Sequence, residues 1–395
     1  MQILVWAVCV VALLYGLLLV WYRNIFTHIP VVGLPPPAWV PITSLTIIIP
    51  ARNEATNIEQ CLQSILQNNY PTHLLQIIVV DDNSTDNTAV LVQKYAAQHV
   101  QLLSLNDWVC EPINSYKKKA IELAVAHARG TLIITTDADC IVPTTWLHSL
   151  AHAYELHKPA FIAAPVVISP LQNKGSKFSF IQLFQCVDFM TLQGVTAAVV
   201  SKNKMTMCNG ANMAYEKAAY DKVGGFAGID DIASGDDMLL MHKIYTLYPG
   251  RILFLKSALA IVHTAPVHTL AQFINQRIRW ASKADKYNDK RILPILLLVY
   301  FFNLSLLIMP VVGLLYRLPL YILDCNLSLG VIWLGLLGYK IIVELFFLYP
   351  VSVFFNKQKL LWYFPLLQIF HIAYTVVAGW LGKFGSYTWK MRRVK

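Results

Sequence analysis

Two aspartates, Asp137 and Asp139, close an apolar, β-branched run that begins at Thr131 and is typical of a buried strand. Side chains at positions i and i+2 of an extended chain point the same way, so both carboxylates can face one ligand. Mg²⁺ is usually held by one or two carboxylates together with substrate phosphates. The D-x-D pair therefore predicts a metal and phosphate site. Because the motif is short, an ordinary strand end is the alternative. The motifs that accompany it favour the metal site.

Two more acidic residues follow apolar strands. Glu54 follows an apolar strand at 46–50, and Asp82 follows one at 75–80 within the run Asp81-Asp82-Asn83-Ser84-Thr85-Asp86. Clustered carboxylates repel one another unless a cation or hydrogen-bond donors offset them, which favours a functional site. The alternative is structural, because D-x-S-x-D also makes a good Asx-turn and helix N-cap.

Two later segments add a base and cations. Asp236 and Asp237 precede a helix expected at 238–245; they are candidates for a general base, or else cap that helix. The segment 270–282 is expected to be an amphipathic helix, with cationic side chains for phosphates and a Trp for ring stacking or for the membrane interface. A basic surface helix is the alternative. The polar side chains of this segment are Gln276, Arg277, Arg279 and Trp280.

Alternating strands and helices must position these side chains. The strands at 46–50, 75–80, 100–105 and 131–137 are separated by helical patterns at 57–67, at 88–98 and before Arg129. This order predicts an α/β domain with a doubly wound, mostly parallel sheet. Ligands of such sheets bind beyond the carboxyl ends of the strands, so Glu54, Asp82 and Asp139 should converge on one crevice.

The composition places part of the chain in a membrane. Of 395 residues, 56% are hydrophobic and 14% are charged, and the mean hydropathy is +0.50. The net charge of +10 suits an anionic membrane face or anionic substrates, whereas the basic residues are too scattered to predict nucleic-acid binding. The seven cysteines show no metal-binding spacing and are expected to be reduced thiols.

The apolar segments predict the topology. Residues 1–23 are expected to be an uncleaved transmembrane anchor with its amino terminus outside, because Arg23 is the first charge, and no basic region or cleavage site marks a signal peptide. A proline-rich linker at 24–44 then leads to a cytoplasmic domain at 45–290, in which 174–204 is an amphipathic helix against the membrane. About four transmembrane helices follow within 291–382, at 292–316, 318–339, 341–355 and 359–381, before a basic cytoplasmic tail at 383–395. A cytoplasmic tail needs an even number of these spans, so two is the alternative.

Taken together, the motifs resemble those of the membrane-bound members of glycosyltransferase family 2, whose soluble domain has the nucleotide-diphospho-sugar transferase (GT-A) fold. The resemblance runs from about Leu45 to Lys283 and includes the D-x-D and Q-x-x-R-W motifs in the family's order. It implies a membrane enzyme, in the plasma or inner membrane, that uses a UDP-sugar donor with Mg²⁺ or Mn²⁺.

The resemblance also implies roles for individual residues. Pro50, Ala51, Glu54 and Asp82 would hold the uracil and ribose, and Lys117 would lie near the donor. Asp137 would contact the ribose or the sugar and, with Asp139, form the metal site. Asp237 would be the catalytic base. The family usually has Glu-Asp at this position, whereas this chain has two aspartates, so Asp236 is the alternative. Gln276, Arg277, Arg279 and Trp280 would hold the diphosphate and the acceptor end.

The expected reaction is direct displacement with inversion, because no second acid/base pair calls for a covalent intermediate. A membrane lipid or lipid-linked acceptor is favoured, and a processive polysaccharide synthase that extends a growing glycan is the alternative. A non-catalytic membrane scaffold or a transporter is a further class. A scaffold would not need both Asp139 and Asp237, and a transporter would be expected to have more spans.

Overall fold

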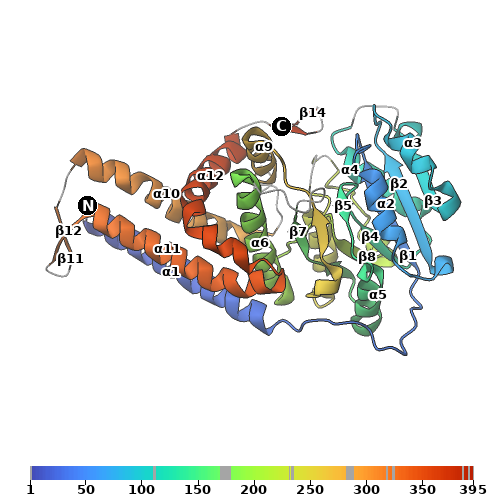
Figure 1. Ribbon diagram of the computed structural model, residues 1–395, viewed down its shortest axis with the longest axis horizontal. Helices are drawn as coiled ribbons and strands as arrows, with labels where there is room; N and C mark the ends of the chain where they lie inside the picture. Colours follow the sequence, from blue (N-terminus) through green and yellow to red (C-terminus); the bar gives the residue numbers. More distant parts are fainter. Residues whose placement is uncertain are drawn as a thin grey trace.

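The computed structural model describes residues 2–109, 113–169, 179–230, 232, 235–281, 289–316, 319–322, 325–384, 387–389 and 392–394. An α/β domain lies at one end of the molecule and a group of long helices at the other, joined by the extended segment that follows α1 (Gln2–His28) (Figure 1). The linker therefore begins after His28, five residues later than the sequence predicted.

The domain is built on a seven-stranded sheet in the order β3-β2-β1-β4-β8-β6-β9. The pairs β3/β2, β2/β1, β1/β4 and β6/β9 are parallel, whereas β8 is antiparallel to both of its neighbours, so the sheet is mostly parallel, as predicted. The strands are β1 (Leu45–Ala51), β2 (Leu75–Asp81), β3 (Val100–Ser104), β4 (Leu132–Thr135), β6 (Phe161–Ala163), β8 (Met213–Glu216) and β9 (Ile252–Phe254). A smaller sheet pairs β5 (Cys140–Ile141), β10 (Val262–Thr264) and β7 (Val166–Ile168).

Helices cover both faces of the main sheet. Successive side chains of β1 enter different cores: Ile48 packs in one core with Ile121 of α4, whereas Ile47 and Ile49 pack in the other with Ile58 of α2. A strand buried on both faces needs a continuous apolar run, which explains the sequence Ile47-Ile48-Ile49. The helices of the domain are α2 (Ile58–Leu66), α3 (Thr88–Gln93), α4 (Tyr116–His127), α5 (Trp146–His157), α7 (Lys217–Lys222) and α8 (Met238–Leu247).

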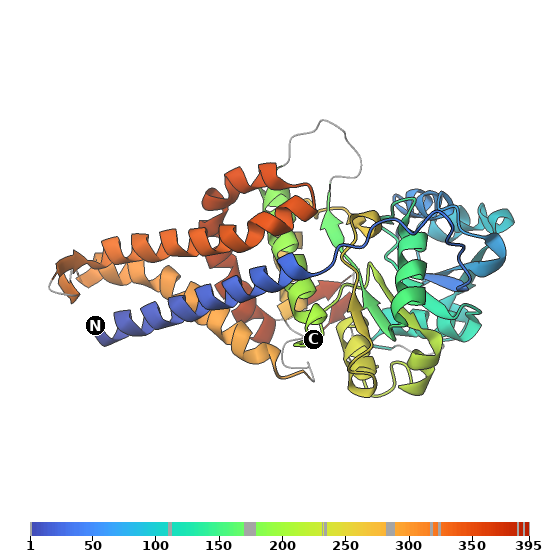
Figure 2. The ribbon, with the colours of Figure 1, turned by 90° about the horizontal axis from the view of Figure 1, so that it is seen from below.

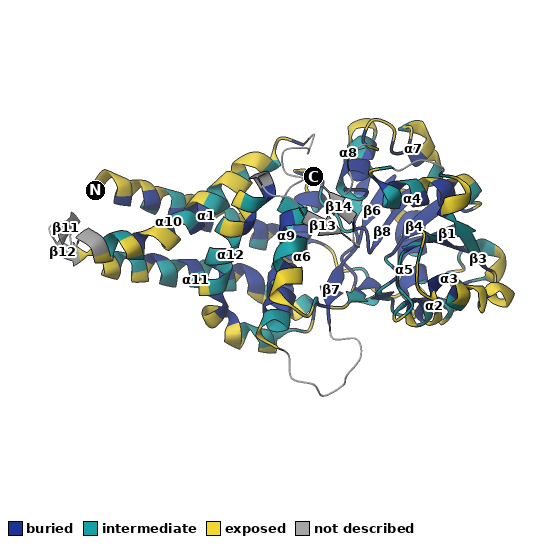
Figure 3. Cartoon of the chain, turned by 90° about the horizontal axis from the view of Figure 1, so that it is seen from above, coloured by how far each residue is buried: buried dark blue, intermediate teal, exposed yellow. Residues whose placement is uncertain are grey.

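Five helices of the described chain are long and apolar enough to cross a membrane. They are α1, α6 (Phe180–Ser201), α10 (Ile292–Tyr316), α11 (Leu329–Phe354) and α12 (Phe364–Phe384), the last preceded by a 3₁₀ turn at Gln358–Tyr363. The outward faces of α1, α10 and α11 are largely exposed, as expected of surfaces that lipid covers (Figure 3). α6 is different, because most of its surface is buried.

The long helices form two sets. α1, α10 and α11 run beside one another, with the amino terminus and the hairpin β11 (Pro319–Ile322)/β12 (Cys325–Ser328) at the end farthest from the sheet (Figures 1 and 2). α6 and α12 run across this direction and, with α9 (Leu270–Ala281), join the helices to the domain. The expected helix at 174–204 is present as α6, although residues 174–178 lie outside the described residues.

The number of helices after Arg291 differs from the expected four. The segments 318–339 and 341–355 were separated at Lys340, but residues 329–354 form one helix, so the described chain has three long helices here. Lys340 is fully buried inside α11, where its Nζ lies 2.5 Å from Glu344 Oε1 one turn away and 2.7 Å from Gln368 Oε1 of α12. The charge is compensated within the helix group, so it does not end the helix.

Candidate active site

A single cavity of about 1130 Å³ extends from the carboxyl ends of β1, β2 and β4 to the space between α1, α6, α9, α10 and α12. Every site residue predicted from the sequence lines it, so the polar clusters that are far apart in the chain do converge. These residues are Pro50, Ala51, Glu54, Asp82, Lys117, Asp137, Asp139, Asp236, Asp237, Gln276, Arg277, Arg279 and Trp280.

The turns after β1 and β2 are joined by Arg52. Its Nη1 donates a hydrogen bond to the carbonyl oxygen of Asp82 at 2.6 Å and lies 3.6 Å from Asp82 Oδ1. Asp82 is 4% exposed. Asn53 and Asn83, next to these residues, both have φ of 52°, a left-handed conformation that Asn tolerates better than most residues. The two turns thus hold Asp82 at one place on the cavity wall.

Two other aspartates of the 81–86 segment, Asp81 and Asp86, accept hydrogen bonds that stabilise the same two turns. Asp81 Oδ2 accepts a hydrogen bond from Ser84 N, and Asp86 Oδ2 accepts one from Ala55 N. Burial by itself would raise the pKa of Asp86, but hydrogen bonds from Thr88 and from the Ala55 backbone together outweigh burial and lower this pKa. The structural interpretation therefore holds for Asp81 and for Asp86, the last residue of D-x-S-x-D, whereas Asp82, the first residue of that motif, lines the cavity.

Lys117, in the first turn of α4, links two of the acidic groups. Its Nζ lies 2.7 Å from Asp137 Oδ1 and 3.1 Å from Asp236 Oδ2. Burial by itself would lower the pKa of Lys117, but the two carboxylates outweigh burial and raise this pKa above its ordinary value. The lysine therefore stays charged and holds the D-x-D turn beside the start of α8.

Asp137 and Asp139 lie in the turn that follows β4, and both line the cavity. The described residues contain no group of three or more His, Cys, Asp or Glu side chains that could hold a metal ion by themselves. Two carboxylates facing one cavity are a donor set that suits a hard cation whose other ligands are phosphate oxygens and water. The residues present thus fit a metal bound together with a diphosphate.

Asp237 is the N-cap of α8. Its Oδ1 accepts a hydrogen bond from Met238 N at 2.7 Å, and its Oδ2 accepts one from Gly210 N at 3.3 Å. Gly210 is tightly surrounded, because a Cβ there would lie 3.2 Å from Asp236 Oδ2 and 3.3 Å from Lys117 Nζ. The turn at 208–212 lines the cavity, and its backbone comes close to the acidic cluster and its lysine.

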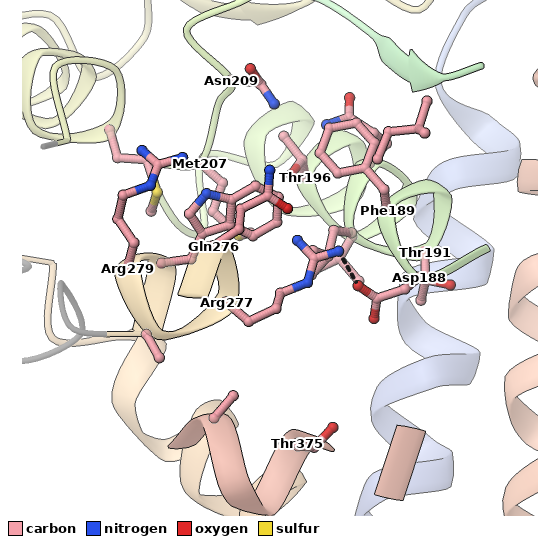
Figure 4. A pocket seen from close by; sticks show the side chains of 18 of the residues that line it. Asp188, Phe189, Thr191, Thr196, Met207, Asn209, Gln276, Arg277, Arg279 and Thr375 are labelled. Atoms are coloured by element: carbon pink, nitrogen blue, oxygen red, sulfur yellow. Dashed lines mark ion pairs between the residues drawn. The ribbon is translucent and has the colours of Figure 1, made fainter. Parts of the chain in front are cut away.

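Arg277 lies deep in the wall of the cavity. Its Nη2 is 2.7 Å from Asp188 Oδ2 of α6 (Figure 4). Its guanidinium lies over the rings of Phe273 and Trp280 at 4.7 and 4.1 Å. Asp188 Oδ1 accepts a hydrogen bond from Tyr374 of α12 at 2.6 Å. The Arg277 and Asp188 side chains are 4% and 5% exposed, so this is a buried ion pair that joins α6, α9 and α12.

Several of these residues were not predicted from the sequence. Asp188 and Tyr374 were not assigned a role, although an acid in an apolar stretch is a signal for a buried partner. Asn212 was not assigned a role either. Its Oδ1 accepts a hydrogen bond from Trp146 Nε1, and its Nδ2 donates to Pro165 O and Ala260 O, so it fixes the turn below the acidic cluster.

Comparison with known proteins gives the family. Residues 46–224 match the model of glycosyl transferase family 2. Curated relatives include the probable glycosyltransferase YdaM of Bacillus subtilis (strain 168), 24% identical over 61% of this chain and 55% of the relative. Dolichyl-phosphate beta-glucosyltransferase ALG5C of Trichomonas vaginalis is 37% identical over 24% of this chain and 28% of the relative. The chain thus spans about half or less of these relatives.

The fold has a solved counterpart. The mannosyltransferase PcManGT from Pyrobaculum calidifontis, in complex with GDP-Man and Mn²⁺, superposes with a TM-score of 0.58 over 94% of this chain and 99% of that one, at 20% identity. That similarity supports the GT-A fold predicted from the motifs. Residues 46–224 of this chain are therefore a glycosyl transferase family 2 domain of the GT-A fold.

Proposed function

We propose that this protein transfers a sugar from a UDP-sugar to an acceptor that is a membrane lipid or is linked to one. The observation that carries the proposal is the course of the cavity, which begins at the predicted nucleotide residues and continues between the apolar helices. A donor made in the aqueous phase and an acceptor held in the membrane need such a shared space. ALG5C, whose name gives dolichyl phosphate as its acceptor, supports a lipid-linked acceptor.

The donor occupies the end of the cavity at the sheet. Pro50, Ala51, Glu54 and Asp82 hold the uracil and ribose, at the strand ends where α/β sheets bind ligands. The buried Arg52 and Asp82 contact supports this assignment, because it fixes the Asp82 side chain before the ligand arrives.

We propose that the metal binds at the D-x-D turn. We assign Asp139, the second aspartate of the D-x-D pair, as the main carboxylate ligand, with Asp137, which also contacts Lys117, as its neighbour. A bound Mg²⁺ or Mn²⁺ supplies positive charge that offsets the charge of the diphosphate leaving group. Arg279 of α9, which lines the cavity, is assigned to the same diphosphate, and Arg277 faces Asp188.

The base is assigned to Asp237, because Asp236 is paired with Lys117. In this mechanism the acceptor hydroxyl oxygen forms a bond to the anomeric carbon as the bond from that carbon to the diphosphate oxygen breaks. The hydroxyl proton passes to the Asp237 carboxylate, and UDP leaves with the electron pair of the broken bond. The result is inversion at the anomeric carbon.

The membrane arrangement follows from the helices. We propose that α1, α10 and α11 cross the membrane, with the amino terminus outside and the catalytic domain in the cytoplasm. α12 runs across these three helices, so an even number of spans, two, follows the domain (Figure 1). This arrangement puts the basic tail on the same side as the domain, as the charge of the tail predicts. The membrane would be the plasma or inner membrane.

Product analysis tests the proposal. Purified full-length protein is incubated with radiolabelled UDP-sugars, Mn²⁺ or Mg²⁺, and a membrane lipid extract. We expect a labelled product that is soluble in organic solvent, and no product from the Asp237→Asn variant, in which the asparagine can still cap α8. A processive polysaccharide synthase, the alternative, would give an ethanol-insoluble polymer. An Asp237→Asn protein with wild-type turnover would overturn the assignment of the base.

A further inference from the structure

The wall of the cavity is open on one side. Among the described residues, six large apolar side chains both line the cavity and are exposed: Leu293, Leu296, Leu297 and Phe301 of α10, Trp380 of α12 and Leu192 of α6. By contrast, the cavity residues of α1 and α11 are buried or half-buried. An exposed apolar set on the wall of a cavity marks an opening that suits an apolar ligand. We call this opening, between α10 and the helices α6 and α12, the lateral mouth.

One edge of the lateral mouth is a contact between α10 and α12. A Cβ on Gly379 would lie 2.9 Å from Tyr300 Cδ2, so the Tyr300 ring packs directly on the backbone of α12. Both residues line the cavity. Leu293, Leu296 and Leu297 come before this contact along α10, and they form the part of the mouth that is nearer to the domain.

The lateral mouth lies at the cytoplasmic end of α10. This helix runs from the domain toward the hairpin β11/β12 at the far end of the molecule (Figure 1). Lys290 and Arg291, directly before it, are exposed, as expected of cations at the cytoplasmic boundary of a membrane. Phe301 lies about 14 Å along the axis from the start of α10, which is less than half of a hydrocarbon core of roughly 30 Å. In the membrane arrangement proposed above, the lateral mouth therefore opens into the cytoplasmic leaflet.

The start of α10 also lies beside the proposed base. Ile292, the first residue of α10, and Met238, the residue after Asp237, line one small pocket together with Thr206 and Asp289. Asp289 Oδ2 accepts a hydrogen bond from Thr206 N at 3.1 Å, which fixes the start of α10 at this place. A lipid with its headgroup at the start of α8 therefore has to cross only the first turns of α10 to reach the lateral mouth.

We propose that the lateral mouth admits the acceptor, a lipid of the cytoplasmic leaflet whose headgroup carries the attacking oxygen. The headgroup lies at the N-terminus of α8, and the hydrocarbon chain leaves the cavity over Leu296 and stays in the leaflet. The cavity, at about 1130 Å³, exceeds the roughly 300–1,000 Å³ of pockets for one small ligand, so the headgroup has space beside the donor. The inference rests on the proposed function and names the side from which its acceptor arrives.

The experiment uses full-length protein in nanodiscs of dioleoylphosphatidylcholine that contain increasing shares of the membrane lipid extract, with the radiolabelled UDP-sugar that the wild type uses. Leu296→Trp puts a larger ring into the lateral mouth, so the half-saturating share of the extract should rise about fivefold or more. Calorimetry should give the wild-type affinity for UDP with Mn²⁺, because the donor occupies the other end of the cavity. The same measurement shows that the variant is folded.

Leu307→Trp is the matched control. Leu307 is 40% exposed against 39% for Leu296, and it does not line the cavity. It lies about three turns further along α10 on nearly the same face, so both substitutions place a tryptophan at an exposed position of one helix. Leu307→Trp should behave as the wild type. Equal half-saturating shares in the two tryptophan variants would overturn the inference.

Cryo-electron microscopy gives a second readout that needs no variant. The wild type in nanodiscs that contain the lipid extract, UDP and Mn²⁺ should show elongated density that passes Leu296 and reaches the start of α8. Density that enters between α1 and α11 instead, or a lateral mouth without density, would contradict the inference.

The outcomes separate the inference from the proposed function. Lipid glycosylation that is equally efficient in Leu296→Trp and the wild type would leave the proposed function intact and remove only the route through the lateral mouth. If the wild type transfers no sugar from any UDP-sugar, the proposed function fails, and the inference fails with it.

Discussion

Replacing Asp188 with Asn should weaken the junction of α6, α9 and α12. Asp188 and Arg277 form an ion pair whose side chains are 5% and 4% exposed. Asparagine has nearly the same size and still offers an oxygen to the Tyr374 hydroxyl, which now donates to Asp188 at 2.6 Å. The substitution therefore removes mainly one negative charge and leaves the guanidinium of Arg277 buried without it.

The size of the effect follows from this burial. Removing one partner of a buried ion pair costs roughly 3–5 kcal/mol, because the other charge stays desolvated. Both side chains line the cavity, which water can reach, so we expect a loss of about 3 kcal/mol in the free energy of unfolding. Transfer should also fall, because α9 carries Arg279 and Trp280.

A double-mutant cycle gives the assay. Urea unfolding in detergent micelles is compared for the wild type, Asp188→Asn, Arg277→Met and the double variant. Replacing both partners of a buried pair by uncharged groups is often nearly neutral, so the double variant should be more stable than Asp188→Asn alone. If the two single effects add within about 0.5 kcal/mol, the two side chains do not interact and the reasoning is refuted.

Three further predictions concern the acidic cluster. Gly210→Ala should lower the rate of transfer, because its Cβ would crowd Lys117, whereas Gly250→Ala, which has open space, should not; equal rates would contradict the packing. The raised pKa of Lys117 means that the stability lost in Lys117→Met should be constant from neutral pH to about the ordinary lysine value of 10.5 and should shrink above it. A loss that already shrinks near neutral pH in urea unfolding would count against the pairing. Asp139→Ala should weaken UDP binding when Mn²⁺ is present, and unchanged affinity by calorimetry would rule out its role as a ligand.

The convergence of the site could be predicted because it depends on local rules. Parallel strands place their carboxyl ends at one edge of the sheet, so Glu54, Asp82 and Asp139 meet once the β/α order is recognised. The resemblance to glycosyltransferase family 2 added the assignments of Lys117 and Asp237, and the structure places both on the same cavity.

Composition alone could not assign different roles to three consecutive lysines. In the run Lys117-Lys118-Lys119, the first lysine faces the acidic cluster, the second is buried and donates to Ile229 O and Ile232 O, and the third pairs with Glu122 on the surface. Adjacent residues on a helix point about 100° apart, so composition alone cannot say which one enters the site.

Residues whose roles depend on partners far away in the chain could not be predicted from the sequence. A lysine between two apolar segments predicts the end of a membrane helix. Lys340 lies inside α11 instead, where it contacts Gln368 and His371 of another helix. Asp188 likewise acquires its role from Arg277 and Tyr374, both far along the chain. Such contacts are set by tertiary packing and leave no periodic pattern in the sequence.

The central claim is that one cavity brings the diphosphate of a sugar nucleotide next to an acceptor from the membrane. Cryo-electron microscopy of the full chain in nanodiscs with UDP and Mn²⁺ tests this claim most directly. The account predicts density for the uridine beside Asp82 and for the metal and diphosphate between Asp139 and Arg279. Nucleotide density at any site outside this cavity would contradict it.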